Sequence, residues 1–153
     1  MSRAKPFRYV LQPVLTTRQW TLDALMQDLQ EANAAVAEAE ERLAALRKRI
    51  EQAGADQKQS MASSHFSADQ VALFARYMQE LNERRREQHG ALSELEEERD
   101  ALIERVMHAR RRVDAVEKHR EKAHRTFMRL HAGVQCKADD DQWLMLQAHR
   151  GMS

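Results

Sequence analysis

Residues 22–50 read LDALMQDLQEANAAVAEAEERLAALRKRI, and their apolar pattern indicates the fold class. Their main apolar positions are separated alternately by three and four residues, a 3.5-residue period that is typical of a left-handed coiled coil. The same alternation continues outward on both sides of this stretch. The positions of this stripe, called the seam, are Leu15, Arg18, Leu22, Leu25, Leu29, Ala32, Val36, Ala39, Leu43, Leu46, Ile50 and Ala53. They predict a long helix over about residues 13–60, with Pro13 in its first turn.

A second segment, residues 67–132, repeats the pattern. Ser67 and Gln70 have the spacing of a capping box, and Phe66 and Val71 have that of a hydrophobic staple. The seam of this second helix is Phe74, Met78, Leu81, Arg85, Gln88, Leu92, Leu95, Arg99, Leu102, Val106, Ala109, Val113, Val116, Arg120, Ala123, Phe127 and Leu130. Because Arg85 and Gln88 are polar, we expect the seam to loosen there. We expect Gly133 to cap the end of the helix.

Residues 61–66 lie between the two periodic segments and are mostly small and polar, which predicts a turn. Two helices joined by a short turn normally pack in antiparallel fashion. The expected fold is all-α, with two long helices forming an antiparallel coiled-coil hairpin over residues 1–132. A C-terminal tail, residues 133–153, follows as irregular chain or as one short helix over 141–149.

Composition supports long helices and excludes several classes of function. Charged residues make up 32% of the 153 residues and aromatic residues 5%, as in coiled coils. The net charge of +1 argues against a dedicated nucleic-acid binder, although both ends of the chain are basic. No apolar run approaches the roughly 20 residues that span a bilayer, and the single cysteine, Cys136, fits a reducing compartment. We expect a cytoplasmic protein without membrane insertion.

No residue pattern indicates catalysis, a metal or a cofactor. The seven histidines lack zinc-binding spacing, and we interpret them as surface residues or as part of a basic patch. Paired carboxylates are expected on a solvated helix face, since a coiled coil offers no cleft to shift their pKa values. The run Arg110, Arg111 and Arg112 is either a solvated flank or a docking patch for an acidic protein. Tyr77, one position off the seam, either contacts a partner or covers the seam edge.

The opening segment FRYVLQPVL, residues 7–15, followed by Arg18 and the Leu/Ala heptads, resembles the FliJ/YscO family of coiled-coil proteins. These proteins belong to the flagellar and type III secretion export apparatus of bacteria. The resemblance implies a non-enzymatic central stalk, in a flagellar or a virulence system. Its termini would enter the pore of a hexameric export ATPase, and its turn end would face the ring of the export gate. Secretion chaperones are further partners that the resemblance implies.

The resemblance also suggests which residues make these contacts. The gate-binding row of flagellar members, Phe-x-x-x-Leu-x-x-Ala-x-x-x-His, falls here on Tyr77, Leu81, Arg84 and Gln88, so its second half departs from the family pattern. The expected ATPase contacts are the basic residues near the chain ends, namely Arg8, Arg18, Arg110, Arg111 and Arg112. The alternative to a stalk is a generic structural or adaptor coiled coil that self-associates, which a concentration-dependent stability would reveal.

Overall fold

The computed structural model describes residues 5–63 and 67–152 of the chain. It contains two long helices, α1 (Gln12–Ala62) and α2 (Ala68–Gly151), and no strand among the described residues. The predicted all-α fold of two long helices is therefore confirmed. The chain divides into two compact units, of which unit 1 comprises Met1–Leu22 and His108–Ser153, and unit 2 comprises Asp23–Met107.

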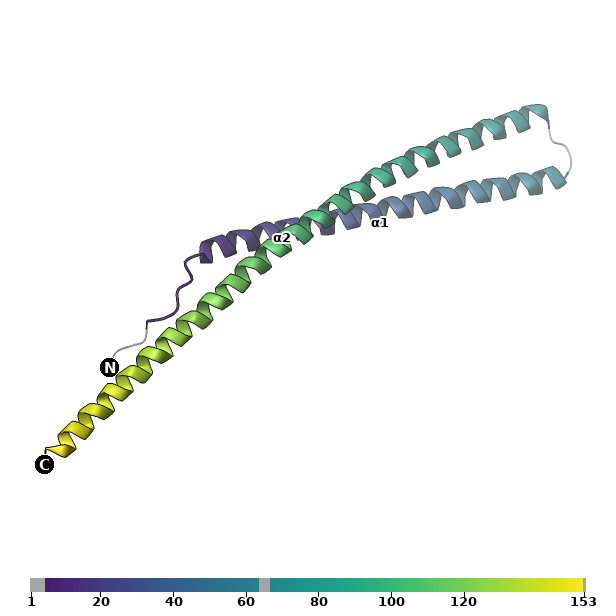
Figure 1. Ribbon diagram of the computed structural model, residues 1–153. Coiled ribbons are helices and arrows are strands. Elements are labelled where there is room, and N and C mark those ends of the chain that lie inside the picture. The colour runs from purple at the N-terminus through teal and green to yellow at the C-terminus, as the bar shows by residue number, and fades with distance from the viewer. Residues whose placement is uncertain (1–4, 64–66, 153) are drawn as a thin grey trace. The chain divides into compact units, whose positions relative to one another are not determined.

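Unit 2 is a helical hairpin, in which α1 and α2 run antiparallel on either side of the turn (Figure 1). Its buried side chains are Val36, Leu43, Leu46, Leu81 and Val106, and all five are seam residues. Every α1 seam position from Leu22 to Ala53 is buried or half-buried, whereas most neighbouring positions are exposed. The 3.5-residue period therefore identified the packed side of both helices correctly.

In unit 1 the first turns of α1 pack on α2 around Leu15, Val113 and Val116. Tyr9 and Leu22 pack against this cluster from its edges. The chain enters α1 through a turn in which the Gln12 N–H donates to the Tyr9 carbonyl at 3.1 Å. Residues 5–9 form no helix, and α1 begins one residue before the predicted Pro13.

The start of α2 follows the predicted capping box. The Gln70 N–H donates to Ser67 Oγ at 3.2 Å, and the Ser67 N–H donates to Gln70 Oε1 at 3.3 Å. These two bonds satisfy backbone donors that the first helical turn leaves free. Phe66, the other half of the predicted staple, lies outside the described residues, as do residues 64 and 65 of the predicted turn. Met61 and Ala62, which were also assigned to the turn, belong to α1.

The end of α2 corrects the prediction. The helix does not stop at residue 132 but continues through Gly133 to Gly151, so no separate tail or short helix follows it. A glycine ends a helix when it adopts the left-handed conformation, and Gly133 does not do so. Glycine inside a helix costs only about 1 kcal/mol relative to Ala. The helix-forming residues on both sides of Gly133 outweigh that cost.

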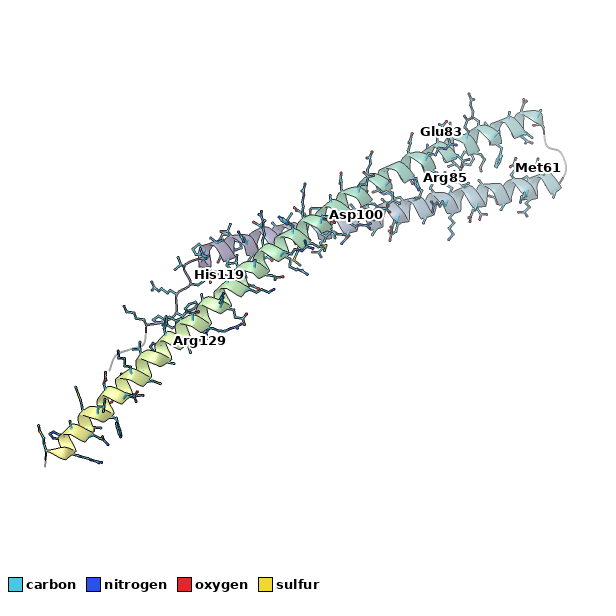
Figure 2. The ribbon with its side chains drawn as sticks, viewed as in Figure 1. Met61, Glu83, Arg85, Asp100, His119 and Arg129 are labelled. Carbon is cyan, nitrogen blue, oxygen red and sulfur yellow. The ribbon has the colours of Figure 1, made fainter. Side chains whose placement is uncertain are left out.

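The seam loosens where Arg85 and Gln88 were expected to disturb it. Arg85 is exposed although it occupies a seam position, and in Figure 2 it lies on the side of α2 that faces α1. Gln88 is half-buried, and its Oε1 atom is buried with no hydrogen-bond partner among the described residues. A buried amide oxygen without a partner lowers stability by about 1–3 kcal/mol.

We therefore expect Gln88→Leu to stabilise unit 2 by about 1–2 kcal/mol, because it removes the unsatisfied oxygen and adds apolar surface to the seam. Thermal and urea denaturation followed by circular dichroism would measure the gain. Gln79→Leu, at an exposed position of the same helix, is the matched control and should leave stability unchanged. A loss of stability in Gln88→Leu would show that Gln88 is hydrogen-bonded in solution.

Candidate docking surfaces

The N-terminal segment is held on α2 by aromatic and histidine side chains, all within unit 1. Tyr9 Oη lies 2.7 Å from His119 Nδ1, and it also donates to the Val116 carbonyl at 3.4 Å. The Phe7 ring stands edge-on to the His124 ring, with centroids 5.0 Å apart, and lies 5.4 Å from the ring of Phe127. These contacts fix residues 7–9 along one side of the helix.

Sequence reasoning missed this role of the histidines. His119 and His124 pack against the N-terminal segment, and the His131 ring stacks on the Phe127 ring at 5.9 Å. One signal was present, because Phe7 and Tyr9 are two residues apart and so share one side of an extended segment. Their partners lie more than 100 positions away in the sequence, and no local pattern identifies such partners.

The five predicted ATPase-contact arginines all lie in unit 1. Arg8 is exposed, and so are Arg110, Arg111 and Arg112. Arg18 is half-buried, and its Nη1 donates to the Arg112 carbonyl at 3.3 Å. The structure therefore brings Arg18 to the arginine run. Arg18 interrupts the apolar seam because its long side chain reaches a backbone carbonyl of the opposite helix.

Charge is segregated between the two units. Unit 1 carries fourteen Lys or Arg and six Asp or Glu, a net charge of +8. Unit 2 carries the remaining eleven basic and eighteen acidic residues, a net charge of −7. The overall charge of +1 hides this division. A surface with such an excess of one sign attracts an oppositely charged partner over about one Debye length, roughly 10 Å at 0.1 M salt.

The last turns of α2 are exposed on every side. All of residues 132–152 are exposed, including four consecutive apolar residues, Trp143, Leu144, Met145 and Leu146, whose exposed fractions are 57–75%. Four consecutive helical residues point in all directions around the axis. A helix that is apolar all round is normally buried, so this end of α2 is suited to a partner that surrounds it.

The predicted gate-contact row lies in unit 2, close to the turn. Tyr77 and Arg84 are exposed, Gln88 is half-buried, and Leu81 is 1% exposed because it fills the seam. Beside this row, a groove between α1 and α2 has Leu73, Phe74 and Tyr77 on one wall and small or polar α1 residues, such as Ala53 and Ser60, on the other. The row and the groove together offer aromatic surface next to charged rims.

The described part of the chain contains no cluster of three His, Cys, Asp or Glu residues placed to hold a metal ion. None of its helices has a segment both long and apolar enough to cross a bilayer. The only cysteine, Cys136, is exposed on α2.

A two-helix hairpin with a packed seam of this period defines a coiled-coil protein. The comparison with known families is more specific. Residues 7–151 match the family described as "Flagellar FliJ protein", which covers nearly the whole chain. The chain belongs to the FliJ family and is thus a component of the flagellar/type III protein export apparatus. No curated protein and no solved structure matches the chain.

Proposed function

We propose that this protein is the non-enzymatic central stalk of a type III export apparatus, flagellar or virulence-associated, at the cytoplasmic face of the membrane. Unit 1 would bind the hexameric export ATPase, and unit 2 would present its turn end to the ring of the export gate. The main support for the proposal is the exposed end of α2, residues 132–152. There the apolar side chains of Trp143, Leu144, Met145 and Leu146 are exposed on all sides of the helix. A ring of subunits can cover such a helix on all sides.

The charge of unit 1 supports the same assignment. Unit 1 has a net charge of +8, and its basic residues lie mainly in residues 1–22 and 108–131, before the exposed end of α2. An export ATPase with acidic loops around its pore would attract unit 1 and repel unit 2. That difference in sign would orient the chain during docking, before close contacts form.

The test is ATP hydrolysis by the cognate export ATPase, measured with and without the purified full-length protein at several salt concentrations. We expect stimulation that saturates near one chain per hexamer and weakens as salt rises, because the docking charges are exposed. An unchanged hydrolysis rate at every salt concentration, together with no co-migration of the two proteins, would exclude the stalk.

Reversing the arginine run, with Arg110→Glu, Arg111→Glu and Arg112→Glu together, should weaken ATPase binding about 10-fold or more while leaving the helical spectrum and melting curve unchanged. All three side chains are exposed, and surface charges contribute little to folding. The bond from Arg18 uses the main-chain carbonyl of Arg112, so substitution retains it.

The matched control for this variant is the reversal of Arg84, Arg85 and Arg86, a second arginine run with the same change in charge but located in unit 2. It should bind the ATPase normally. Equal loss of binding in both variants would indicate that net charge matters and that the run in unit 1 is not a specific contact. The affinity is best measured by titration at a fixed salt concentration.

For the gate contact, we propose that Tyr77 and Arg84 touch the export-gate ring, that Gln88 borders this contact, and that Leu81 supports it from beneath. The exposure of Tyr77 and Arg84 and the burial of Leu81 favour this division of roles. The adjoining groove enlarges the available apolar surface. Secretion chaperones remain proposed additional partners of the same protein.

A further inference from the structure

A second stripe runs along α2 with the same alternation of three and four residues as the seam, on the opposite side of the helix. In unit 2 its members are Glu80, Glu83, Glu87, Gly90, Glu94, Glu97, Ala101 and Glu104. In unit 1 its members are His108, Arg111, Ala115, Lys118, Lys122, Arg125 and Arg129. Every one of these residues is exposed. In Figure 2, Glu83 lies on the side of α2 away from α1.

The stripe is segregated by charge. Its part in unit 2, the acidic stripe, has six glutamates and no basic residue, and its part in unit 1, the basic stripe, has five Lys or Arg and no acidic residue. A solvated helix face usually mixes both signs to gain pairs four residues apart, whereas like charges at that spacing repel. Glu83 and Glu87 have this spacing, and so do Lys118 and Lys122. A partner of opposite charge would relieve both repulsions.

The two stripes complement each other in order as well as in sign. When the acidic stripe of one copy is laid antiparallel on the basic stripe of another, residues whose numbers sum to 215 or 216 lie opposite. The opposed pairs are Glu87 with Arg129, Glu94 with Lys122, Glu97 with Lys118, and Glu104 with Arg111. Glu80 and Glu83 lie beyond the last basic residue, Arg129, and have no basic residue opposite them in this register. Ala101 meets Ala115, which allows close approach, and Arg125, already 3.2 Å from Glu121, faces Gly90.

From this agreement we propose that the acidic stripe of unit 2 in one chain binds the basic stripe of unit 1 in a second copy of the chain, in the antiparallel register given above. Every chain carries both stripes, so either copy of a pair can supply either one. A nucleic acid or an anionic membrane would find only the basic stripe attractive, and the acidic one would repel it. A second copy is the favoured partner, because one antiparallel register places acidic residues of one chain opposite basic residues of the other.

This association is distinct from the proposed stalk function and does not depend on it. Arg111 belongs both to the basic stripe and to the proposed ATPase contact, so pairing of two copies covers it. The pair would be the state of the free protein, and the export ATPase would compete with the second copy for unit 1.

The experiment is sedimentation equilibrium of the full-length chain at several concentrations and at low and high salt. We expect a monomer–dimer equilibrium that shifts toward monomer as salt rises. The variant Lys118→Glu with Lys122→Glu, and the variant Glu94→Lys with Glu97→Lys, should each weaken the dimer by about 10- to 100-fold, because each places like charges opposite one another. An equimolar mixture of the two variants should restore dimers, since every altered residue then faces its opposite.

Arg47→Glu with Lys48→Glu is the control for Lys118→Glu with Lys122→Glu, because it makes the same change in net charge at two exposed positions of α1. It should dimerise like the original chain. Circular dichroism of each variant would establish that its helices are intact. A monomeric original chain at low salt, or failure of the mixture to restore dimers, would overturn the proposal.

A cysteine pair tests the register itself. With Cys136→Ser in every chain, Ala101→Cys chains mixed with Ala115→Cys chains should form disulfide-linked dimers under mild oxidation, and neither variant alone should do so. A parallel pair in register would instead link Ala101→Cys chains to each other, and that result would contradict the proposed orientation.

Discussion

Leu43→Asp is expected to destabilise the hairpin of unit 2 by about 3–5 kcal/mol, because it removes a buried leucine and places a carboxylate in the seam. Leu43 is 3% exposed and is a seam position of α1 within unit 2. The melting temperature of the Leu43→Asp variant should be lower than that of the original chain by about 10 °C or more. Thermal denaturation followed by circular dichroism at 222 nm, an ordinary wavelength for helix content, would measure the change.

The control is Ala44→Asp, which places the same side chain one residue further along α1 at an exposed position. It should change stability by less than about 0.5 kcal/mol. Similar melting curves for the two variants would contradict the seam register. Because both variants carry the same added charge on the same helix, their difference isolates the effect of burial.

Removal of residues 133–153 is expected to abolish stimulation of the export ATPase and to leave the rest of the fold intact. The deleted segment is exposed throughout its described part and contributes no buried side chain. The contacts of Phe7 and Tyr9 with α2 lie before the deletion and are retained. Hydrolysis assays and melting curves of the shortened chain would separate the two effects.

A second variant tests the apolar residues of this segment without shortening the chain. Replacing Trp143, Leu144, Met145 and Leu146 with Gln keeps the helical propensity high while removing the apolar surface. It should lose stimulation as the deletion does. Gln at Met107 and Met128, which are exposed elsewhere on α2, is the control and should stimulate normally. Full stimulation by the variant with four Gln substitutions would mean that the exposed end of α2 is not the ATPase contact.

Much of the fold could be predicted from local sequence patterns. The seam positions of α1 and the capping box at Ser67 follow from spacing alone, because each depends on residues within a few turns of one another. The same spacing predicted where the seam loosens, since the amide of Gln88 and the charge of Arg85 cannot be packed like leucine.

The features that were predicted wrongly or not predicted have a different physical origin. Gly133 was expected to end α2, but a glycine does so only in the left-handed conformation, and that choice depends on the energy of the continuing helix. The division into two units, the groove near Tyr77 and the histidine contacts depend on packing between distant segments. The gate-contact row taken from the family resemblance includes Leu81, which is buried, together with exposed residues. A sequence motif alone does not show which of its positions are buried in the seam.

The contact between Tyr9 and His119 has a consequence for the order in which the chain folds during synthesis. Its two residues are 110 positions apart, so Tyr9 leaves the ribosome long before its partner is made. The hairpin of unit 2 can close as soon as Met107 has emerged, since its pairs are nearest in sequence beside the turn. Phe7 and Tyr9 thus find their place on α2 only after the hairpin of unit 2 can close, and until then the nascent chain carries these two aromatic side chains undocked.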